Sequence, residues 1–197
     1  PDNEYVDNSL RLTSINHIFD VTSKPLIFDA DTGGKIEHFD MKIKTIERTG
    51  ISAIIMEDKI GLKKNSLLEN TKNQTQEDIS VFAKKIAIGK KAQVSRDFMI
   101  IARIESFILG KKLNDAMKRA EAYLASGADG IMIHSKDKSP KEVFNFARSF
   151  KKSFKEIPLI CVPSTYNSVK EKELIKEGFN IVIYANHMLR GAYPAML

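Results

Sequence analysis

The chain has 197 residues, of which 43% are hydrophobic, and a formal net charge of +6. This length and apolar content predict one globular domain with a sizeable core and exclude a disordered chain. No run of about 18 apolar residues could cross a membrane and no leader pattern stands at the amino terminus, so we expect a cytoplasmic protein. The lysines are scattered over several segments and form no stripe among aromatic residues, which argues against a nucleic-acid partner.

Six short, apolar segments rich in β-branched residues predict strands that are buried on both faces. They are residues 25–31, 52–58, 98–104, 130–135, 159–163 and 180–186. The segments between them repeat apolar residues at helical spacing, most clearly over 39–46, 79–86 and 143–150. Alternating strands and helices predict a parallel sheet, either open and doubly wound or closed as a barrel.

The predicted helices carry end signals. The sequence "SPKE" offers Ser139 as N-cap, Pro140 as the first helical residue and Glu142 as the partner in a capping box. Three glycines, Gly50, Gly127 and Gly178, stand where helices should end. These signals fix the expected order of elements along the chain.

Polar side chains follow the end of every predicted strand. They are Asp29 and Asp31, Glu57 and Asp58, Arg103 and Glu105, His134 and Ser135, Ser164 and Thr165, and Asn186 and His187. Each alone could be a cap, a structural ion pair or a satisfied core residue. Chemistry collects at the carboxyl ends of parallel strands, however, so together they predict a site.

Three of these carboxylates should converge, because Asp29 and Asp31 share one face of a strand and Glu57 ends the next strand. Converging carboxylates repel one another unless a cation lies among them, and all-oxygen ligation favours Mg²⁺, or Mn²⁺ as a substitute. Magnesium with few protein ligands usually coordinates a phosphorylated or carboxylate substrate. The sequence thus predicts a metal site and a small anionic substrate.

The stretch "MEDKIGLKKNS" opens the long connection of residues 59–75. A loop of this length in a compact domain is usually functional or disordered, and a solvated turn is the plain alternative. Lys59 and Lys63, with Arg103 and His134, offer cationic partners for an anion. "DTGG" lacks the spacing of a nucleotide-binding loop, so any phosphate belongs to the small substrate.

The chain resembles the phosphoenolpyruvate mutase family of the isocitrate lyase and phosphoenolpyruvate mutase superfamily over essentially its whole length. The segments that carry the resemblance are "DADTGGKIEHF", "EDKIGLKKNS", "IARIESFILGK", "RAEAYLASGADGIMIHS" and "VIYANHMLRGAYPAM". The resemblance implies an α/β fold of the (β/α)8 TIM-barrel type. Residues 1–197 would form one barrel domain that lacks the first strand region and the end of the last helix. It also implies a homo-oligomer, a tetramer built as a dimer of dimers that exchange the last helix.

The resemblance further implies an isomerase that interconverts phosphoenolpyruvate and 3-phosphonopyruvate with Mg²⁺ and forms a carbon–phosphorus bond in phosphonate biosynthesis. Asp29, Asp31 and Glu57 would form the metal site. Arg103 and His134 would bind the substrate's phosphoryl and carboxylate groups, and Asp2 would lie close to the reacting centre. Lys63, Asn65 and Ser66 would close over the substrate as a gating loop, with Asn65 touching the phosphoryl group.

Three alternatives remain open. A phosphonopyruvate hydrolase would use the same carboxylates, with threonine at the position of Asn65. A carbon–carbon lyase of the same superfamily would carry a cysteine in a "KCGH"-like loop, whereas the single Cys161 lies in the apolar run "LICVP" and is expected to pack in the core. An inactive, incomplete barrel is the non-enzymatic alternative.

Overall fold

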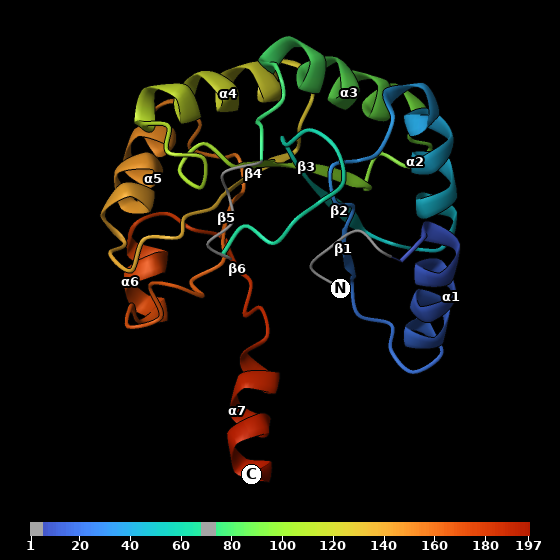
Figure 1. Ribbon diagram of the computed structural model, residues 1–197. Coiled ribbons are helices and arrows are strands. Elements are labelled where there is room, and N and C mark those ends of the chain that lie inside the picture. Colours follow the sequence, from blue (N-terminus) through green and yellow to red (C-terminus); the bar gives the residue numbers. More distant parts are fainter. Residues whose placement is uncertain (1–5, 68–73) are drawn as a thin grey trace.

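The structure is a computed structural model that describes residues 6–67 and 74–197. Six parallel strands form one sheet in the order β1-β2-β3-β4-β5-β6. They are β1 (Ile27–Asp29), β2 (Ala53–Glu57), β3 (Met99–Ile104), β4 (Gly130–Ile133), β5 (Leu159–Cys161) and β6 (Ile181–Val182). Each lies within a predicted strand, and the sheet curls into part of a TIM-type barrel, which confirms the predicted fold class (Figure 1).

Helices cover the outer side of the curved sheet (Figure 1). The helices of the described residues are α1 (Asn8–Phe19), η1 (Ile36–His38), α2 (Phe39–Arg48), α3 (Ile79–Ala92), α4 (Leu113–Ala125), α5 (Lys141–Ser153), α6 (Glu171–Lys176) and α7 (His187–Met196). The last of these, α7, extends away from the sheet and has no buried residue. Over residues 6–67 and 74–197, each helix is too short or too polar to span a membrane.

The two faces of the sheet carry separate apolar clusters. On the outer face, Ile54 and Met56 of β2 join the large cluster that the helices cover, together with Phe39 of α2. On the inner face, Ala53 and Ile55 join a smaller cluster with residues of β3, β4 and β5. Because side chains alternate along a strand, the residue at the end of β2 that continues the inner series is Glu57, and the outer series continues with Asp58.

The helix ends confirm the predicted terminal glycines but not the predicted capping box. Gly50, Gly127 and Gly178 follow α2, α4 and α6 with φ of 90°, 98° and 97°, as glycines that end helices should. The prediction of a capping box before α5 is wrong. Pro140, in place of Ser139, is the N-cap.

The reason for the failed capping box lies at the end of β4. Glu142 accepts a hydrogen bond from the Ser135 hydroxyl. Its carboxylate therefore ties the start of α5 to the carboxyl end of β4 and is not used as a cap. The connection between them is fixed by a side chain of the strand.

The long connection after β2 is closed at its base by backbone pairing. Lys59 and Gln76 form an antiparallel bridge, and Ile60 N donates to Thr75 O at 2.9 Å. The two ends of the loop therefore leave and return at the same place, beside the carboxyl ends of β2 and β3. This geometry holds residues 60–67 close to the inner face of the sheet.

Candidate active site

A cavity of about 460 Å³ lies on the inner side of the sheet at its carboxyl edge. Six residues predicted for the site line it: Asp29, Lys63, Asn65, Ser66, Arg103 and His134. Strand alternation places three of them there, because Asp29, Arg103 and His134 each lie two residues after an inner-face apolar residue. The predicted Asp2 lies outside the described residues.

Two of the predicted metal ligands meet at one cation. The Lys63 ammonium forms a short ion pair with Asp29 and lies 3.5 Å from Oδ1 of Asp31. Although burial opposes the effect, Lys63 holds the pKa of Asp29 below its usual value. Asp31 has φ of 57°, a left-handed conformation that few residues with a side chain adopt, and it is buried. The turn after β1 therefore aims two carboxylates at the same point.

Arg11 is a site residue that the sequence does not reveal. Its guanidinium pairs with the Asp31 carboxylate, donates to the Asp29 carbonyl, and lies 4.2 Å from the centre of the Phe28 ring. The helix that carries it, α1, buries only Ile15, so no apolar stripe predicts the helix or its orientation. Nothing in the sequence distinguishes Arg11 from the other basic residues.

Glu57 lies deeper, with 1% of its side chain exposed. Its carboxylate oxygens are 3.0 Å from Lys59 Nζ and 3.3 Å from Arg103 Nη2, but neither accepts a hydrogen bond within the part of the chain that the structure describes. Burial, with the nearby charge of Glu105, raises the pKa of Glu57 to about 7. This carboxylate therefore has acceptor capacity that residues 6–67 and 74–197 leave unused.

The three predicted metal ligands meet part of what a divalent cation needs. Asp29, Asp31 and Glu57 offer the hard oxygen donors that Mg²⁺ prefers. Residues 6–67 and 74–197 contain no group of three or more acidic, histidine or cysteine side chains arranged as a metal site. Two of the carboxylates nevertheless share a cation, the Lys63 ammonium, and Glu57 keeps two unused buried oxygens. The residues present fit a divalent cation in the place of that ammonium, and the ligand set stays a prediction.

Elsewhere on the cavity wall, Arg103 contacts three side chains besides Glu57. Its Nε donates to Glu105 at 2.6 Å, and its Nη2 donates to Ser66 Oγ at 2.9 Å and lies 2.9 Å from His134 Nδ1. Burial would raise the pKa of Glu105, but Arg103 and His134 hold it well below its usual value. The guanidinium is therefore oriented by a charged carboxylate before any substrate binds.

The same network sets the state of His134. Burial and then the charge of Arg103 lower its pKa, so the imidazole is neutral at pH 7. Its Nδ1 lies 2.9 Å from Arg103 Nη2, which donates, and 3.1 Å from Glu105 Oε1, which accepts, so Nδ1 finds a partner with or without a proton. His134 thus adds a neutral polar ring beside the cationic guanidinium.

Asn65 and Lys59 both come from the loop after β2, but their side chains lie in different places. Asn65 lines the cavity, and its Oδ1 accepts from Leu67 N at 2.7 Å, which fixes the plane of the amide. Lys59, which the sequence offers as a cation for the substrate, does not line the cavity. Its ammonium is held by oxygens of the protein.

Asp58, which the sequence places among the site residues, does not line the cavity either. It is fully buried on the outer side of β2, where it accepts from Arg119 at 3.1 Å, Tyr123 at 2.7 Å and Gln76 at 2.9 Å. These partners belong to α4 and to the end of the loop. Asp58 therefore serves the scaffold, as the alternation of β2 requires.

Comparison with known proteins places this geometry in a family. The family model described as phosphoenolpyruvate phosphomutase matches residues 1–197. A phosphoenolpyruvate phosphomutase of Tetrahymena pyriformis is 39% identical over 186 residues, which cover 94% of this chain and 61% of that protein. The chain thus spans about three fifths of the length of that relative.

Two solved structures are similar throughout the chain. A phosphoenolpyruvate phosphomutase from Streptomyces platensis subsp. rosaceus has a TM-score of 0.92 and 34% identity, covering 100% of this chain and 67% of that one. A phosphonopyruvate hydrolase in complex with oxalate and Mg²⁺ has a TM-score of 0.86 and 35% identity, covering 100% of this chain and 66% of that one. Sequence identity therefore does not separate the two activities.

Proposed function

The chain belongs to the phosphoenolpyruvate phosphomutase family, and from that premise we propose that it catalyses the Mg²⁺-dependent interconversion of phosphoenolpyruvate and 3-phosphonopyruvate. The observation that carries the proposal is a single cavity with two chemically opposite sides. Asp29 lines one part of the wall and is joined through Lys63 to the buried Asp31, and Arg103 with His134 line another part. A substrate that carries a phosphoryl group and a carboxylate, and that binds a metal, matches both sides.

The cationic side accounts for binding of the phosphoryl group. Arg103 has a planar guanidinium suited to phosphate oxygens, and Glu105 and Ser66 already fix its orientation. His134 adds a neutral imidazole ring beside it. Because these groups are already in place, they need to move little when charge develops on the phosphoryl oxygens. A preorganised site stabilises a transition state in this way.

The acidic side accounts for the metal. Asp29 and Asp31 would hold the ion where the Lys63 ammonium now lies, and Glu57 would receive water molecules of its hydration shell. A bound Mg²⁺ would supply positive charge next to the oxygens of the pyruvate enolate left when the phosphoryl group departs. In exchange, Lys63 would be released toward the substrate's anionic groups.

The loop after β2 accounts for the choice of product. A phosphoryl group in a loose, metaphosphate-like transition state is captured by water unless water is excluded. Asn65 and Ser66 lie on the cavity wall, where they can close over the substrate. We therefore propose that they, with Lys63, form the lid that returns the phosphoryl group to carbon three.

Phosphonopyruvate hydrolysis is the second candidate function. The solved hydrolase that is 35% identical to this chain supports it, because that protein binds oxalate and Mg²⁺ and shares the fold along the whole chain. It needs the same carboxylates and the same cationic wall. The two activities differ in whether water reaches the phosphoryl group.

Phosphorus NMR of the protein incubated with phosphonopyruvate and Mg²⁺ distinguishes the two. The proposal expects phosphoenolpyruvate with little inorganic phosphate, and loss of turnover when the divalent metal is removed. Asn65→Ala should lower turnover by about tenfold or more, the effect of losing one charge-assisted hydrogen bond. Lys64→Met is the matched control, because Lys64 is an exposed neighbour in the same loop. Inorganic phosphate and pyruvate as the main products would make the hydrolase assignment correct.

A further inference from the structure

Lys59 is a buried lysine whose ammonium is surrounded by oxygens. Only 3% of its side chain is exposed. Three uncharged oxygens and two carboxylates surround Nζ: Lys64 O at 3.0 Å, Ser66 Oγ at 2.8 Å, Gln74 Oε1 at 2.7 Å, Glu57 at 3.0 Å and Glu105 at 3.4 Å. An ammonium has three hydrogens, so these uncharged acceptors satisfy it while the carboxylates balance its charge.

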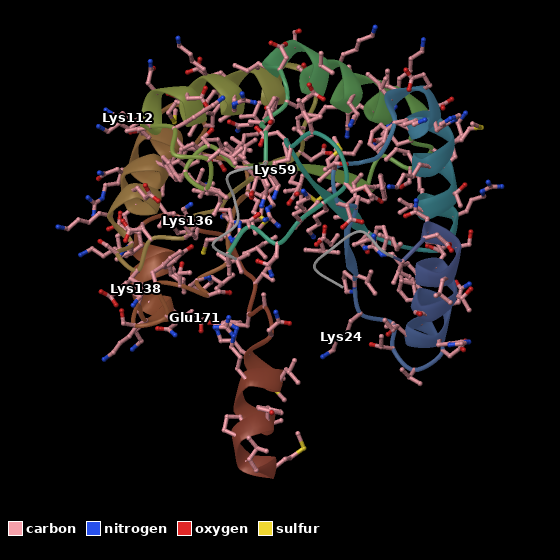
Figure 2. The ribbon with its side chains drawn as sticks, viewed as in Figure 1. Lys24, Lys59, Lys112, Lys136, Lys138 and Glu171 are labelled. Atoms are coloured by element: carbon pink, nitrogen blue, oxygen red, sulfur yellow. The ribbon has the colours of Figure 1, made fainter. Side chains whose placement is uncertain are left out.

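The five oxygens come from two different parts of the fold. Glu57 is the last residue of β2 and Glu105 directly follows β3, so both are fixed by the sheet. The uncharged acceptors belong to the loop, and they stand on both sides of residues 68–73, since Lys64 and Ser66 precede that stretch and Gln74 follows it. Lys59 therefore joins the loop to the sheet. Figure 2 shows Lys59 in the crowded interior, whereas Lys24 and Lys112 lie at the periphery.

One contact of Lys59 leads directly to the cavity. Ser66 Oγ, which accepts from Lys59, also accepts from Arg103 Nη2 at 2.9 Å and donates to Glu105 at 2.5 Å. The position of the loop and the orientation of the guanidinium thus depend on one hydroxyl that Lys59 holds. Lys59 does not touch the cavity itself, so any effect on substrate must pass through the loop.

We propose that Lys59 is a positioning residue that latches the loop over the cavity. Its ammonium holds Lys63, Asn65 and Ser66 in the closed arrangement by binding the loop backbone and two loop side chains at once. Without the ammonium, the loop loses its anchor, and the Glu57 and Glu105 carboxylates lose one of the two cations that they share, Arg103 being the other. The loop then opens more often.

The simpler alternative is that Lys59 only stabilises the fold as a whole. The two interpretations differ in where the protein becomes mobile after the ammonium is removed. A latch protects the loop locally, so its loss should increase opening of residues 60–67 and leave the helices unchanged. A purely structural lysine should affect helices and loop alike.

Hydrogen–deuterium exchange with peptide-level mass spectrometry measures this difference in the unliganded protein. In Lys59→Met, backbone amides of residues 60–67 should exchange about tenfold faster or more, because three hydrogen bonds are lost, while peptides of α5 keep their parent rates. The control is Lys64→Met, which removes an exposed lysine side chain of the same loop and should leave exchange unchanged. Exchange in residues 60–67 within twofold of the parent would overturn the proposal.

A second variant covers the case in which Lys59→Met fails to fold. Gln74→Leu removes one of the three uncharged acceptors, along with the long Gln74 Nε2 contact to Asn65 O at 3.4 Å, and leaves every buried charge in place. It should accelerate exchange in residues 60–67 by a smaller factor, about threefold, again with α5 unchanged. Equal acceleration in the loop and in α5 for both variants would support the purely structural alternative and refute the latch.

A catalytic measurement extends the test and rests on the proposed function. In Lys59→Met, the share of inorganic phosphate among the products should rise, because an open loop admits water. KM should rise more than kcat falls, since Lys59 makes no contact with substrate. If the protein converts no phosphonopyruvate, the proposed function fails, but the exchange measurement still decides the role of Lys59.

Discussion

Replacing Arg119 by methionine should destabilise the fold strongly, because it leaves a buried carboxylate without its counter-charge. Arg119 Nη1 lies 3.1 Å from Asp58 Oδ2, and both side chains are almost completely buried, at 4% and 0% exposure. Arg119 also donates to the Glu77 carbonyl at 2.9 Å and to Tyr123 Oη at 2.8 Å. Methionine keeps an unbranched side chain and removes these three interactions, together with the ion pair between Arg119 Nε and Asp115 at 3.0 Å.

The size of the loss in stability depends on the interactions that the buried Asp58 carboxylate keeps in Arg119→Met. Asp58 keeps neutral donors from Tyr123, Gln76 and the Glu105 backbone, but its charge has no other cation in ion-pair contact among residues 6–67 and 74–197. Breaking a buried ion pair on one side costs about 3–5 kcal/mol. Domain stabilities are about 5–15 kcal/mol, so the loss is a large share of the total.

Urea unfolding followed by circular dichroism measures this loss as a fall in the free energy of unfolding at constant m-value. The matched control is Arg148→Met, since Arg148 lies on α5 and pairs with Glu177 at the surface, where solvent screens the interaction. The control should stay close to the parent. A loss below about 1 kcal/mol for Arg119→Met would refute the reasoning, because it would mean that Asp58 needs no counter-charge.

Three further predictions concern packing, the thiol and assembly. Gly89→Ala should destabilise by about 1–3 kcal/mol in urea unfolding, because the new methyl would lie 2.7 Å from side chains of α2 and β3, whereas Gly191→Ala, with open space around it, should not. Burial raises the pKa of the Cys161 thiol to about 12, so Ellman's reagent at pH 8 should react only after unfolding. The exposed apolar residues of α7, such as Leu189 (62% exposed), predict an oligomer in sedimentation experiments that Leu189→Glu dissociates. Monomer alone at micromolar concentration would contradict the prediction of an oligomer.

The sequence predicts the strands well because each is a short apolar run that must be buried on two faces. All six runs became neighbouring parallel strands, even residues 180–186, where only Ile181–Val182 have strand geometry. Helices with a wide apolar stripe, such as α2 and α5, are predicted for the same reason. The helix α1 is not, because it buries only Ile15 and is held through Arg11, a contact made at the end of a long flexible side chain.

The same limit applies to the candidate site. Strand periodicity predicts that Asp29, Arg103 and His134 share the inner face, because that placement depends only on the backbone. It does not predict that Lys63 lies between Asp29 and Asp31. That contact is made from a loop, whose path depends on many weak interactions, and a lysine side chain has several rotatable bonds. Which cation balances which carboxylate is therefore decided by tertiary structure.

The three consecutive charged residues Glu57, Asp58 and Lys59 show which side-chain positions strand periodicity can predict. In sequence they form one polar strand end, but in the structure Glu57 lies next to Arg103 on the inner side, Asp58 faces α4, and Lys59 holds the loop. The separation of the first two follows from alternation alone, since Ile55 is on the inner face and Met56 on the outer. Substitutions at the end of β2 should therefore divide by face, with inner positions changing activity and outer positions changing stability. Lys59 falls outside this rule because the strand ends at Glu57, and beyond that point only the contacts of the loop decide where a side chain acts.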